Sequence, residues 1–268
     1  MGNGSVDESS SAGLTSGAIF DLHGDVAIVT GASSGIGARF ARVLAANGAR
    51  VALVGRRAEA LERVASDIAG AGGDAMVFAM DIADAAAIPA LFDAVEARFG
   101  RATVVVNNAG IAGPGRATEI EFQYWRDIMA VDLDAAYLMC REAARRLSAN
   151  GGGSIINVTS ILAVIATAGD AAYSVAKAGL HHLTRVMALE LAPMQVRVNA
   201  IVPGYVVTGM NRAFFESDAS APLVGTIPMQ RVGQVDDLDG AILLLASKAS
   251  RFMTGSTITI DGGHTTAT

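Results

Sequence analysis

The sequence predicts an α/β fold, a single doubly wound parallel sheet of the Rossmann type with helices on both faces. Three observations predict it. Short β-branched apolar runs alternate with helical stretches from about residue 25 onward. These runs are apolar throughout, which is typical of parallel strands buried on both faces. A glycine-rich turn, "GASSGIG" (31–37), joins the first run to the first helix.

The strand and helix signals follow one another in chain order. After the glycine turn, 38–48 is amphipathic, and a long helical stretch covers 122–149. A second long stretch, 170–192, opens at Asp170, an N-cap residue type, and stops at Pro193. The other expected elements are the helix 58–73 and the strands 26–30, 50–55, 75–81, 102–110, 152–160, 196–204 and 257–263. Right-handed crossovers between such strands give the doubly wound sheet.

The domain organisation is simple. No linker divides the chain, so we expect one Rossmann-type catalytic domain over 20–268. The Gly/Ser-rich residues 1–19 are expected to be a disordered tail. The stretch 209–234 contains two prolines and interrupts the alternation. Loops at the carboxyl ends of parallel strands line the ligand crevice, so this stretch is a candidate substrate lid.

Composition excludes several classes of function. The 268 residues carry a formal charge of −6 with scattered basic residues, which argues against nucleic acid as a partner. No apolar run reaches the length of a bilayer-spanning helix, and the N-terminus lacks a secretory signal pattern, so no membrane association is expected. One cysteine, Cys140, fits a reducing compartment, so we expect a cytoplasmic protein. The four histidines show no metal-ligand spacing, and no metal site is expected.

The glycine-rich turn allows two interpretations. Gly31, Gly35 and Gly37 would let the backbone approach a phosphate, which the following helix N-terminus attracts. The same residues match G-x-S-x-G, in which Ser33 would be the nucleophile of a serine hydrolase. In hydrolases of that fold the motif follows several strands, whereas here it follows the first. The phosphate-binding interpretation is therefore favoured.

Tyr173 and Lys177 lie four residues apart in the stretch 170–192. On a helix this spacing places both side chains on one face, one turn from each other. Taken alone, the pair is typical of a helix surface with snorkelling side chains. Ser160 lies thirteen residues before Tyr173, and the three residues occur with several further motifs.

The combination of motifs resembles the short-chain dehydrogenase/reductase family, including its 3-oxoacyl-reductase and gluconate-dehydrogenase members. The resemblance extends from about residue 20 to the last residue of the sequence. The motifs that carry it are "TGASSGIG" (30–37), "NNAG" (107–110), Ser160 with Tyr173-x-x-x-Lys177, and "VNAIVPGYVVT" (198–208). It implies an NAD(P)-dependent oxidoreductase, of the class EC 1.1.1.-, that interconverts a secondary alcohol and a ketone by hydride transfer.

The resemblance also implies the catalytic roles. Tyr173 would be the general acid/base, although a free tyrosine, with a pKa of about 10, is a poor base near neutrality. Lys177 would lower that pKa and bind the cofactor ribose. Ser160 would orient the substrate oxygen. Many members of the family have an asparagine where this chain has Asp132, within "AVDLDAAYL". In the family that asparagine joins a proton relay largely through its main-chain carbonyl, which an aspartate also supplies, so we expect Asp132 to take over this part.

The second strand indicates which cofactor is preferred. Dinucleotide-binding folds often place an acid at its end to bind the ribose 2′-hydroxyl of NAD(H). Here Gly55 occupies that place, and Arg56 and Arg57 follow, whose guanidinium groups suit a 2′-phosphate. We therefore expect NADP(H), with NAD(H) as the alternative. The alternative explanation of Arg56 and Arg57 is a solvated pair on the protein surface that has no role in binding.

The resemblance assigns further cofactor contacts. Ile36 would offer its backbone to the pyrophosphate, Asp81 would contact the adenine, and Thr208 would meet the nicotinamide amide. Asp81 could equally cap a helix, because it follows a strand. The full set of expected cofactor residues is Gly31, Ser33, Ser34, Gly35, Ile36, Gly37, Arg56, Arg57, Asp81, Ile82, Asn108, Ala109, Gly110, Tyr173, Lys177, Pro203, Gly204, Val206 and Thr208.

Two alternatives to the dehydrogenase stay open. A regulator could keep the fold and sense NADP(H) without turnover, although an intact Ser160, Tyr173 and Lys177 argue against it. The serine hydrolase acting through Ser33 is the other. The expected partner is a small-molecule alcohol or ketone, and the resemblance suggests a homo-oligomer, either a tetramer or a dimer.

Overall fold

The structure is a computed structural model, and it describes residues 15–209 and 211–267. Most of the expected tail, residues 1–14, lies outside the described residues. Within the described part, Ser16–Ile19 (α1) form a helical turn, because the carbonyl of Thr15 accepts hydrogen bonds from the amides of Ala18 and Ile19. The disordered tail expected over 1–19 stays a prediction.

Seven parallel strands form one sheet in the order β3–β2–β1–β4–β5–β6–β7. The strands are β1 (Val26–Thr30), β2 (Arg50–Gly55), β3 (Ala75–Ala79), β4 (Val104–Asn107), β5 (Gly153–Val158), β6 (Val196–Pro203) and β7 (Thr257–Ile260). Ile28 of β1 pairs with Ala52 of β2 on one side and with Val105 of β4 on the other. The direction of winding reverses between β1 and β4, which confirms the predicted doubly wound sheet.

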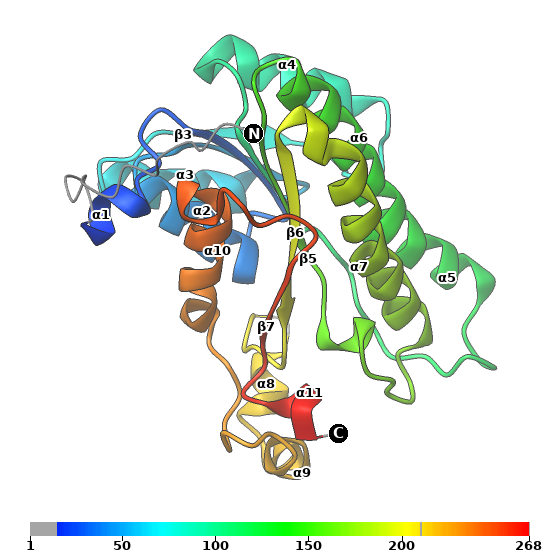
Figure 1. Cartoon of the computed structure of the whole chain (residues 1–268). Helices are drawn as coiled ribbons and strands as arrows, with labels where there is room; N and C mark the ends of the chain where they lie inside the picture. Colours follow the sequence, from blue (N-terminus) through cyan, green and yellow to red (C-terminus); the bar gives the residue numbers. More distant parts are fainter. Residues whose placement is uncertain (1–14, 210, 268) are drawn as a thin grey trace, which may run out of the picture.

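Helices cover both faces of this sheet (Figure 1). On one face lie α2 (Gly35–Ala46), α3 (Ala58–Gly70) and α10 (Asp239–Ala246), and on the other lie α4 (Ala87–Phe99), α6 (Ala135–Ser148) and α7 (Ala171–Leu191). The expected helix 122–149 consists of α5 (Phe122–Met129), a π-helical turn η1 (Ala130–Asp134), and α6. The shorter elements are η2 (Ile161–Ala163), η3 (Ala192–Met194), α8 (Arg212–Phe215), η4 (Asp218–Ser220), α9 (Ala221–Gly225), η5 (Val235–Leu238), η6 (Lys248–Ser250) and α11 (His264–Ala267).

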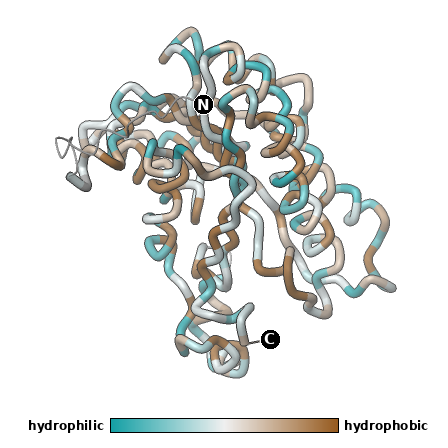
Figure 2. Tube along the Cα trace, viewed as in Figure 1, coloured by the Kyte–Doolittle hydropathy of each residue, from teal (hydrophilic) through white to brown (hydrophobic). Residues whose placement is uncertain are grey.

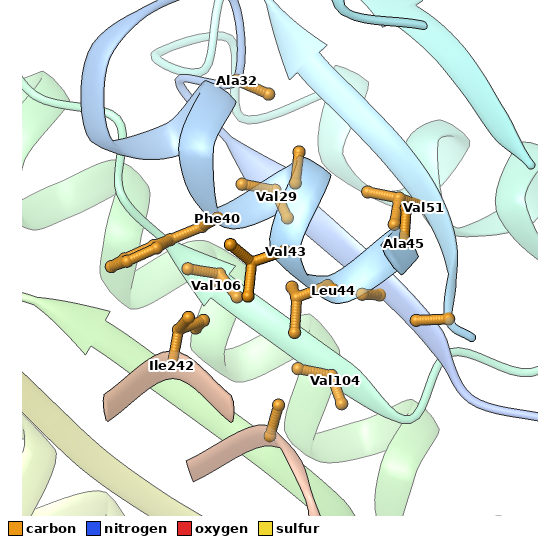
Figure 3. Packing of buried hydrophobic residues seen from close by; sticks show 14 of the residues in the cluster. Val29, Ala32, Phe40, Val43, Leu44, Ala45, Val51, Val104, Val106 and Ile242 are labelled. Carbon is orange, nitrogen blue, oxygen red and sulfur yellow. The ribbon is translucent and has the colours of Figure 1, made fainter. Parts of the chain in front are cut away.

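Alternate residues along each strand pack into two separate hydrophobic cores. Val29 and Val106 point toward α2 and α10, where Phe40 and Ile242 complete the first core (Figure 3). Their neighbours along the strands, such as Val105, belong to the second core beneath α4, α6 and α7. Because both faces are buried, the strands must be apolar throughout, and the central strands accordingly stand out as hydrophobic in Figure 2.

The expected lid stretch 209–234 lies beyond the carboxyl end of β6, where Figure 1 shows α8 and α9 below the sheet. Met210 lies outside the described residues. The ring of Phe215 in α8 packs edge-on against Tyr205, with centroids 6.3 Å apart, and so connects this segment to the residues that follow β6. The segment therefore borders the edge of the sheet at which parallel α/β folds bind ligands.

Candidate functional site

A groove runs along the carboxyl edge of the sheet, at the reversal between β1 and β4. It consists of two hollows of about 410 Å³ and about 540 Å³. Some residues line both hollows, so the two are continuous. These shared residues are Gly31, Ser34, Ala109, Gly110, Ile111 and Gly209.

The glycine-rich turn lies at the centre of the groove. Gly31 and Gly35 have φ angles of +67° and +55°, a left-handed conformation that glycine adopts most easily. A Cβ atom on Gly37 would lie 2.4 Å from Asn108 Nδ2 and 2.5 Å from the Gly31 carbonyl oxygen. Gly37 is therefore packed beneath the turn, and its contribution is the close approach of α2 to the residues around Asn108.

The "NNAG" segment after β4 braces this turn. Asn108 Nδ2 donates a hydrogen bond to the Thr30 carbonyl at 2.9 Å, and the backbone amides of Asn108 and Ala109 both donate to Thr30 Oγ1 at 3.0 Å. A Cβ atom on Gly110 would lie 2.7 Å from Asp132 Oδ2. The segment thus fixes the wall of the groove between its two hollows and leaves room there only for a glycine.

The two arginines after β2 have different surroundings. Arg57 Nη2 donates hydrogen bonds to Ser33 Oγ at 2.9 Å and to Ser34 Oγ at 2.7 Å, so its guanidinium holds both hydroxyl groups of the glycine turn. Arg56 is exposed and lines the larger hollow beside Gly55. Both cations therefore face the part of the groove expected to hold the adenosine end of a dinucleotide.

Asp81 and Ile82 line the same hollow, next to Met80. Asp81 Oδ1 accepts a hydrogen bond from the Ala83 amide at 3.0 Å. The carboxylate thus stabilises the turn after β3 while remaining in the wall of the hollow. Helix α4 begins only at Ala87, so Asp81 caps a turn and not the helix itself.

Ser160, Tyr173 and Lys177 meet in the smaller hollow. Ser160 follows β5 at the start of η2, and its Oγ accepts a hydrogen bond from the Leu162 amide at 3.1 Å. Tyr173 and Lys177 lie in the first two turns of α7, with Lys177 Nζ 5.5 Å from the centroid of the Tyr173 ring. The predicted proximity of these three side chains is thus present in the structure.

Lys177 is almost completely buried and forms an ion pair with Asp132. Its Nζ lies 3.2 Å from Asp132 Oδ2 and donates a hydrogen bond to the Val158 carbonyl at 3.2 Å. Burial lowers the pKa of Lys177, but electrostatic interactions with Tyr173 and Asp132 outweigh burial and raise the pKa above its usual value.

Asp132 is fully buried in the π-helical turn η1, in contact with Lys177. Burial raises the pKa of Asp132 above its usual value, against the opposing effects of the Lys177 charge and the Ile111 amide. That amide donates a hydrogen bond to Asp132 Oδ1 at 2.8 Å. The side chain of Asp132 therefore holds both Lys177 and the wall of the groove at Ile111.

A buried polar network connects α7 to the strands. Asn107 Nδ2 donates to Asn157 Oδ1 at 2.8 Å, and Asn157 Nδ2 donates to Thr184 Oγ1 at 2.9 Å. Cys140 lies in contact with both amides, and burial raises the pKa of its thiol to about 12. The network joins β4, β5, α6 and α7, so it helps to set the position of α7 relative to the sheet.

The segment after β6 forms the opposite wall of the smaller hollow. The hollow is lined by Pro203, Gly204, Val206 and Thr208, and the cofactor contacts expected of these residues stay a prediction. The amide of Thr208 donates a hydrogen bond to Asn211 Oδ1 at 2.7 Å, and Asn211 Nδ2 donates to the Val206 carbonyl at 2.9 Å. Asn211, which the sequence did not single out, thereby holds this wall in place.

The further residues that line the smaller hollow include Asp170 and Tyr205, neither of which we assigned to the site. Both line the hollow that contains Ser160 and Tyr173. Asp170 was interpreted as the N-cap of α7, but its side chain makes no capping hydrogen bond. The sequence signal that could have assigned Asp170 to the site is its position three residues before Tyr173.

The surroundings of Ser33 do not favour the hydrolase. A nucleophilic serine needs a neighbouring group that can accept its proton. The groups bonded to Ser33 Oγ are Nε and Nη2 of Arg57, and a guanidinium has no acceptor. Ser33 is therefore placed to accept hydrogen bonds in the wall of the groove and not to attack a carbonyl group.

The groove fits a dinucleotide in shape and in chemistry. Its glycine cradle lies directly before α2, whose N-terminal amides begin at Gly35. A Cβ atom on Gly35 would lie 3.3 Å from the Thr208 side chain, so the cradle is narrow at this point. One hollow presents the two arginines and the other presents Ser160, Tyr173 and Lys177, so the two ends of a bound dinucleotide would meet different chemistry.

The described residues contain neither a helix that could cross a membrane nor a cluster of acidic, histidine or cysteine side chains that could hold a metal ion. None of the helices in 15–209 and 211–267 is long and apolar enough to cross a membrane. Within the same residues, no group of three or more His, Cys, Asp or Glu side chains is arranged to hold a metal ion.

Comparison with known proteins gives consistent matches along the chain. A family model described as enoyl-(acyl carrier protein) reductase matches residues 31–265. The chain is 39% identical to D-threitol dehydrogenase of Mycolicibacterium smegmatis over 92% of its own length and 95% of that protein. It is 40% identical to cis-4-hydroxycyclohexanecarboxylate dehydrogenase of Sinomonas cyclohexanicum, over 90% of its own length and 96% of that protein.

Solved structures match a similar share of the chain. The gluconate 5-dehydrogenase of Burkholderia cenocepacia, in complex with NADP and tartrate, superimposes with a TM-score of 0.89 at 35% sequence identity. The match covers 93% of this chain and 98% of that one. The similarity therefore extends over nearly the whole chain.

Proposed function

This chain belongs to the short-chain dehydrogenase/reductase family and is an NAD(P)-dependent oxidoreductase, and from this premise we propose that it interconverts a secondary alcohol and a ketone. The observation that carries the proposal is the meeting of Ser160, Tyr173 and Lys177 in one hollow, at the end of a glycine-lined groove. The relatives act on alcohols of several kinds, according to their names.

The chain's own residues would bind the substrate oxygen and transfer the hydroxyl proton. Ser160 Oγ already accepts the Leu162 amide hydrogen, so its O–H is available to donate to the substrate oxygen and hold it. During alcohol oxidation Tyr173 would take the hydroxyl proton, and during ketone reduction it would return one. The buried ammonium of Lys177 would stabilise the phenolate that this transfer requires. When bound, the nicotinamide cofactor accepts or supplies the hydride.

We further propose NADP(H) as the preferred cofactor, with NAD(H) as the alternative. Arg56 is exposed in the hollow beside Gly55, where a carboxylate would otherwise favour the ribose 2′-hydroxyl. Arg57 already holds Ser33 and Ser34, so it would present an ordered cation and two hydroxyl groups to a 2′-phosphate. Three related structures, the gluconate 5-dehydrogenase among them, contain NADP.

The remaining expected contacts follow the groove. Ile36 would approach the pyrophosphate, Asp81 and Ile82 the adenine, and Thr208 the nicotinamide amide. Lys177 would bind the nicotinamide ribose. The proton relay expected through Asp132 stays a prediction. It would run through the main-chain carbonyl of Asp132, because the side chain is occupied with Lys177 and Ile111.

We also propose that the protein is a homo-oligomer. An apolar stripe on α7 is exposed in the single chain, with Val175 and Val186 half-exposed and Leu189 80% exposed. These residues are eleven and three positions apart, so they lie on one face of the helix. A second copy of the chain would bury this face, as the expected dimer or tetramer requires, and sedimentation analysis gives the stoichiometry.

We further propose one catalytic domain over 20–268, with its lid at 209–234. A cytoplasmic location stays a prediction from the cysteine usage.

The test combines binding with turnover. NADPH and NADH are titrated by fluorescence into the wild type and the Arg56→Ala variant, and oxidation of a panel of secondary alcohols is followed at 340 nm. We expect tight NADPH binding that weakens selectively in Arg56→Ala. Tyr173→Phe should bind NADPH normally and lose about 10²- to 10⁴-fold in kcat.

Each other outcome identifies a different error. Full biological effect of Tyr173→Phe without turnover would favour the cofactor-sensing regulator. Preference for NADH would refute the role of the arginines but leave the dehydrogenase intact. Binding of neither cofactor, together with labelling of Ser33 by a phosphonate probe, would refute the dehydrogenase and restore the hydrolase.

A further inference from the structure

Asp170 has a carboxylate that forms no bond with the other described residues. It precedes α7 at the N-cap position but makes no side-chain capping bond. Within 15–209 and 211–267 this carboxylate forms no hydrogen bond and no ion pair. The side chain is half-buried, and burial raises the pKa of Asp170 above its usual value. A half-buried acid of this kind is stabilised by any ligand that brings a hydrogen-bond donor.

The position of Asp170 directs it to the substrate. It lines the hollow that contains Ser160 and Tyr173, away from the arginines of the adenosine end. Tyr205 lines the same hollow, and burial together with the negative charge of Asp170 raises the pKa of the Tyr205 phenol. The two side chains therefore belong to one polar region beside the reacting position.

The charges in this hollow do not balance. Among the described residues that line it, Asp170 and Lys177 are the charged side chains. Lys177 is buried, and its ammonium is already paired with Asp132 and lies against the Tyr173 ring, so it is not available to pair with a carboxylate of the substrate. What remains toward the substrate is the negative charge of Asp170. A hollow with this field favours a neutral ligand with donors and disfavours a second carboxylate.

We propose that Asp170 is a specificity-determining residue that selects a neutral substrate with several hydroxyl groups. A hydroxyl group of the substrate, other than the one being oxidised, donates a hydrogen bond to the Asp170 carboxylate. The inference rests on the proposed function, since it concerns the alcohol that Ser160 and Tyr173 bind. Asp170 takes no proton or hydride in the reaction, and its role is to bind and orient.

The hydrogen-bond chemistry gives an order of substrates. A hydroxyl donor to a carboxylate improves binding by about tenfold to a hundredfold over an alcohol that lacks it. A simple alkanol would leave the carboxylate partly desolvated and unpaired. A sugar acid would add like-charge repulsion to that loss. The expected order in kcat/KM is therefore alditol, then alkanol, then aldonate of matching length.

The experiment measures kcat/KM with NADP⁺ for six-carbon and four-carbon alditols, the aldonates of the same lengths, and 2-hexanol. The wild type should prefer each alditol to its aldonate by at least tenfold. In Asp170→Asn this ratio should fall at least tenfold, mainly through a higher KM for the alditol and a lower KM for the aldonate. Glu190→Gln, which removes the same charge from the exposed far end of α7, should leave the ratio unchanged.

Folding is checked in both variants by thermal unfolding and by NADPH titration, neither of which should change. Preference of the wild type for aldonates, or an unchanged ratio in Asp170→Asn, would overturn the inference while the turnover itself upheld the proposed function. An absence of oxidation of every alcohol in the panel by the wild type, with either cofactor, would instead count against the proposed function and against the inference with it.

Discussion

Lys177 and Asp132 form an ion pair from which solvent is almost completely excluded, with Nζ 3.2 Å from Oδ2. The pair lies directly beneath Gly110, where a Cβ atom would come within 2.7 Å of Asp132 Oδ2 and 3.3 Å of Lys177 Nζ. The ammonium that faces Tyr173 is thus held from behind by a carboxylate. Its charge therefore depends on a residue that does not touch the substrate hollow.

The first prediction concerns this dependence. Asp132 raises the pKa of Lys177, whereas burial, the larger single effect, lowers it. In Asp132→Asn the opposing carboxylate is gone, so the pKa of Lys177 should fall. Because the ammonium is lost when pH rises through that pKa, the alkaline limb of the kcat/KM profile should move to lower pH. The measurement is the profile from pH 6 to pH 11.

The control is Asp134→Asn, an exposed acid in the same π-helical turn, and its profile should match the wild type. An alkaline limb of Asp132→Asn that stayed in place, or moved to higher pH, would show that Asp132 does not maintain the charge of Lys177. The side chain would then serve the Ile111 amide alone.

The sequence allowed the prediction of Asp132 as a site residue, but not of its ion pair. Its distance from Lys177 along the chain is 45 positions, and the π-helical turn that aims its side chain leaves no periodic signal. The strands and the glycine turn were predictable because burial on both faces and a phosphate cradle impose residue types locally. Asp170 shows the opposite case, since its cap-like position suggested a structural role that its side chain does not perform.

The second prediction concerns the cofactor preference and the missing acid at Gly55. A Cβ atom there would lie 3.7 Å from Leu61 Cδ2 and 3.8 Å from Ser33 Oγ, which are ordinary contacts, so a side chain fits. In Gly55→Asp the new carboxylate should repel a 2′-phosphate and accept a hydrogen bond from a ribose hydroxyl. We expect the ratio of the Kd values for NADPH and NADH to rise by at least tenfold, as measured by fluorescence titration.

The matched control is Gly70→Asp, which adds the same charge at the exposed end of α3, where a Cβ atom meets nothing within 4 Å. It should leave both Kd values within about twofold of the wild type. If Gly55→Asp weakened both cofactors equally, the new side chain would be disturbing Arg57 and the serines of the turn, and the position would not select between the cofactors.

The third prediction concerns stability at the start of α10. Asp237 accepts hydrogen bonds from Arg231 at 2.7 Å and 2.8 Å and from the Gln234 amide at 2.7 Å, and these contacts lower the pKa of Asp237 to about 2. They close the turn η5 that leads into α10, whose Asp239 bonds Arg39 of α2. Because the pair is partly exposed, Asp237→Asn should cost only about 1 kcal/mol of unfolding free energy at pH 7.

The pH dependence tests the cause of that loss. An acid whose pKa is lower in the folded state stabilises the fold above its unfolded pKa of 3.8, and the stabilisation disappears as pH falls through about 2. The difference between wild type and Asp237→Asn in urea unfolding should therefore be full at pH 6 and shrink between pH 4 and pH 2. Asp236→Asn removes the same charge one residue earlier and should change stability by less than about 0.5 kcal/mol. A difference for Asp237→Asn that stayed constant down to pH 2 would mean that the turn depends on packing at this position and not on the carboxylate.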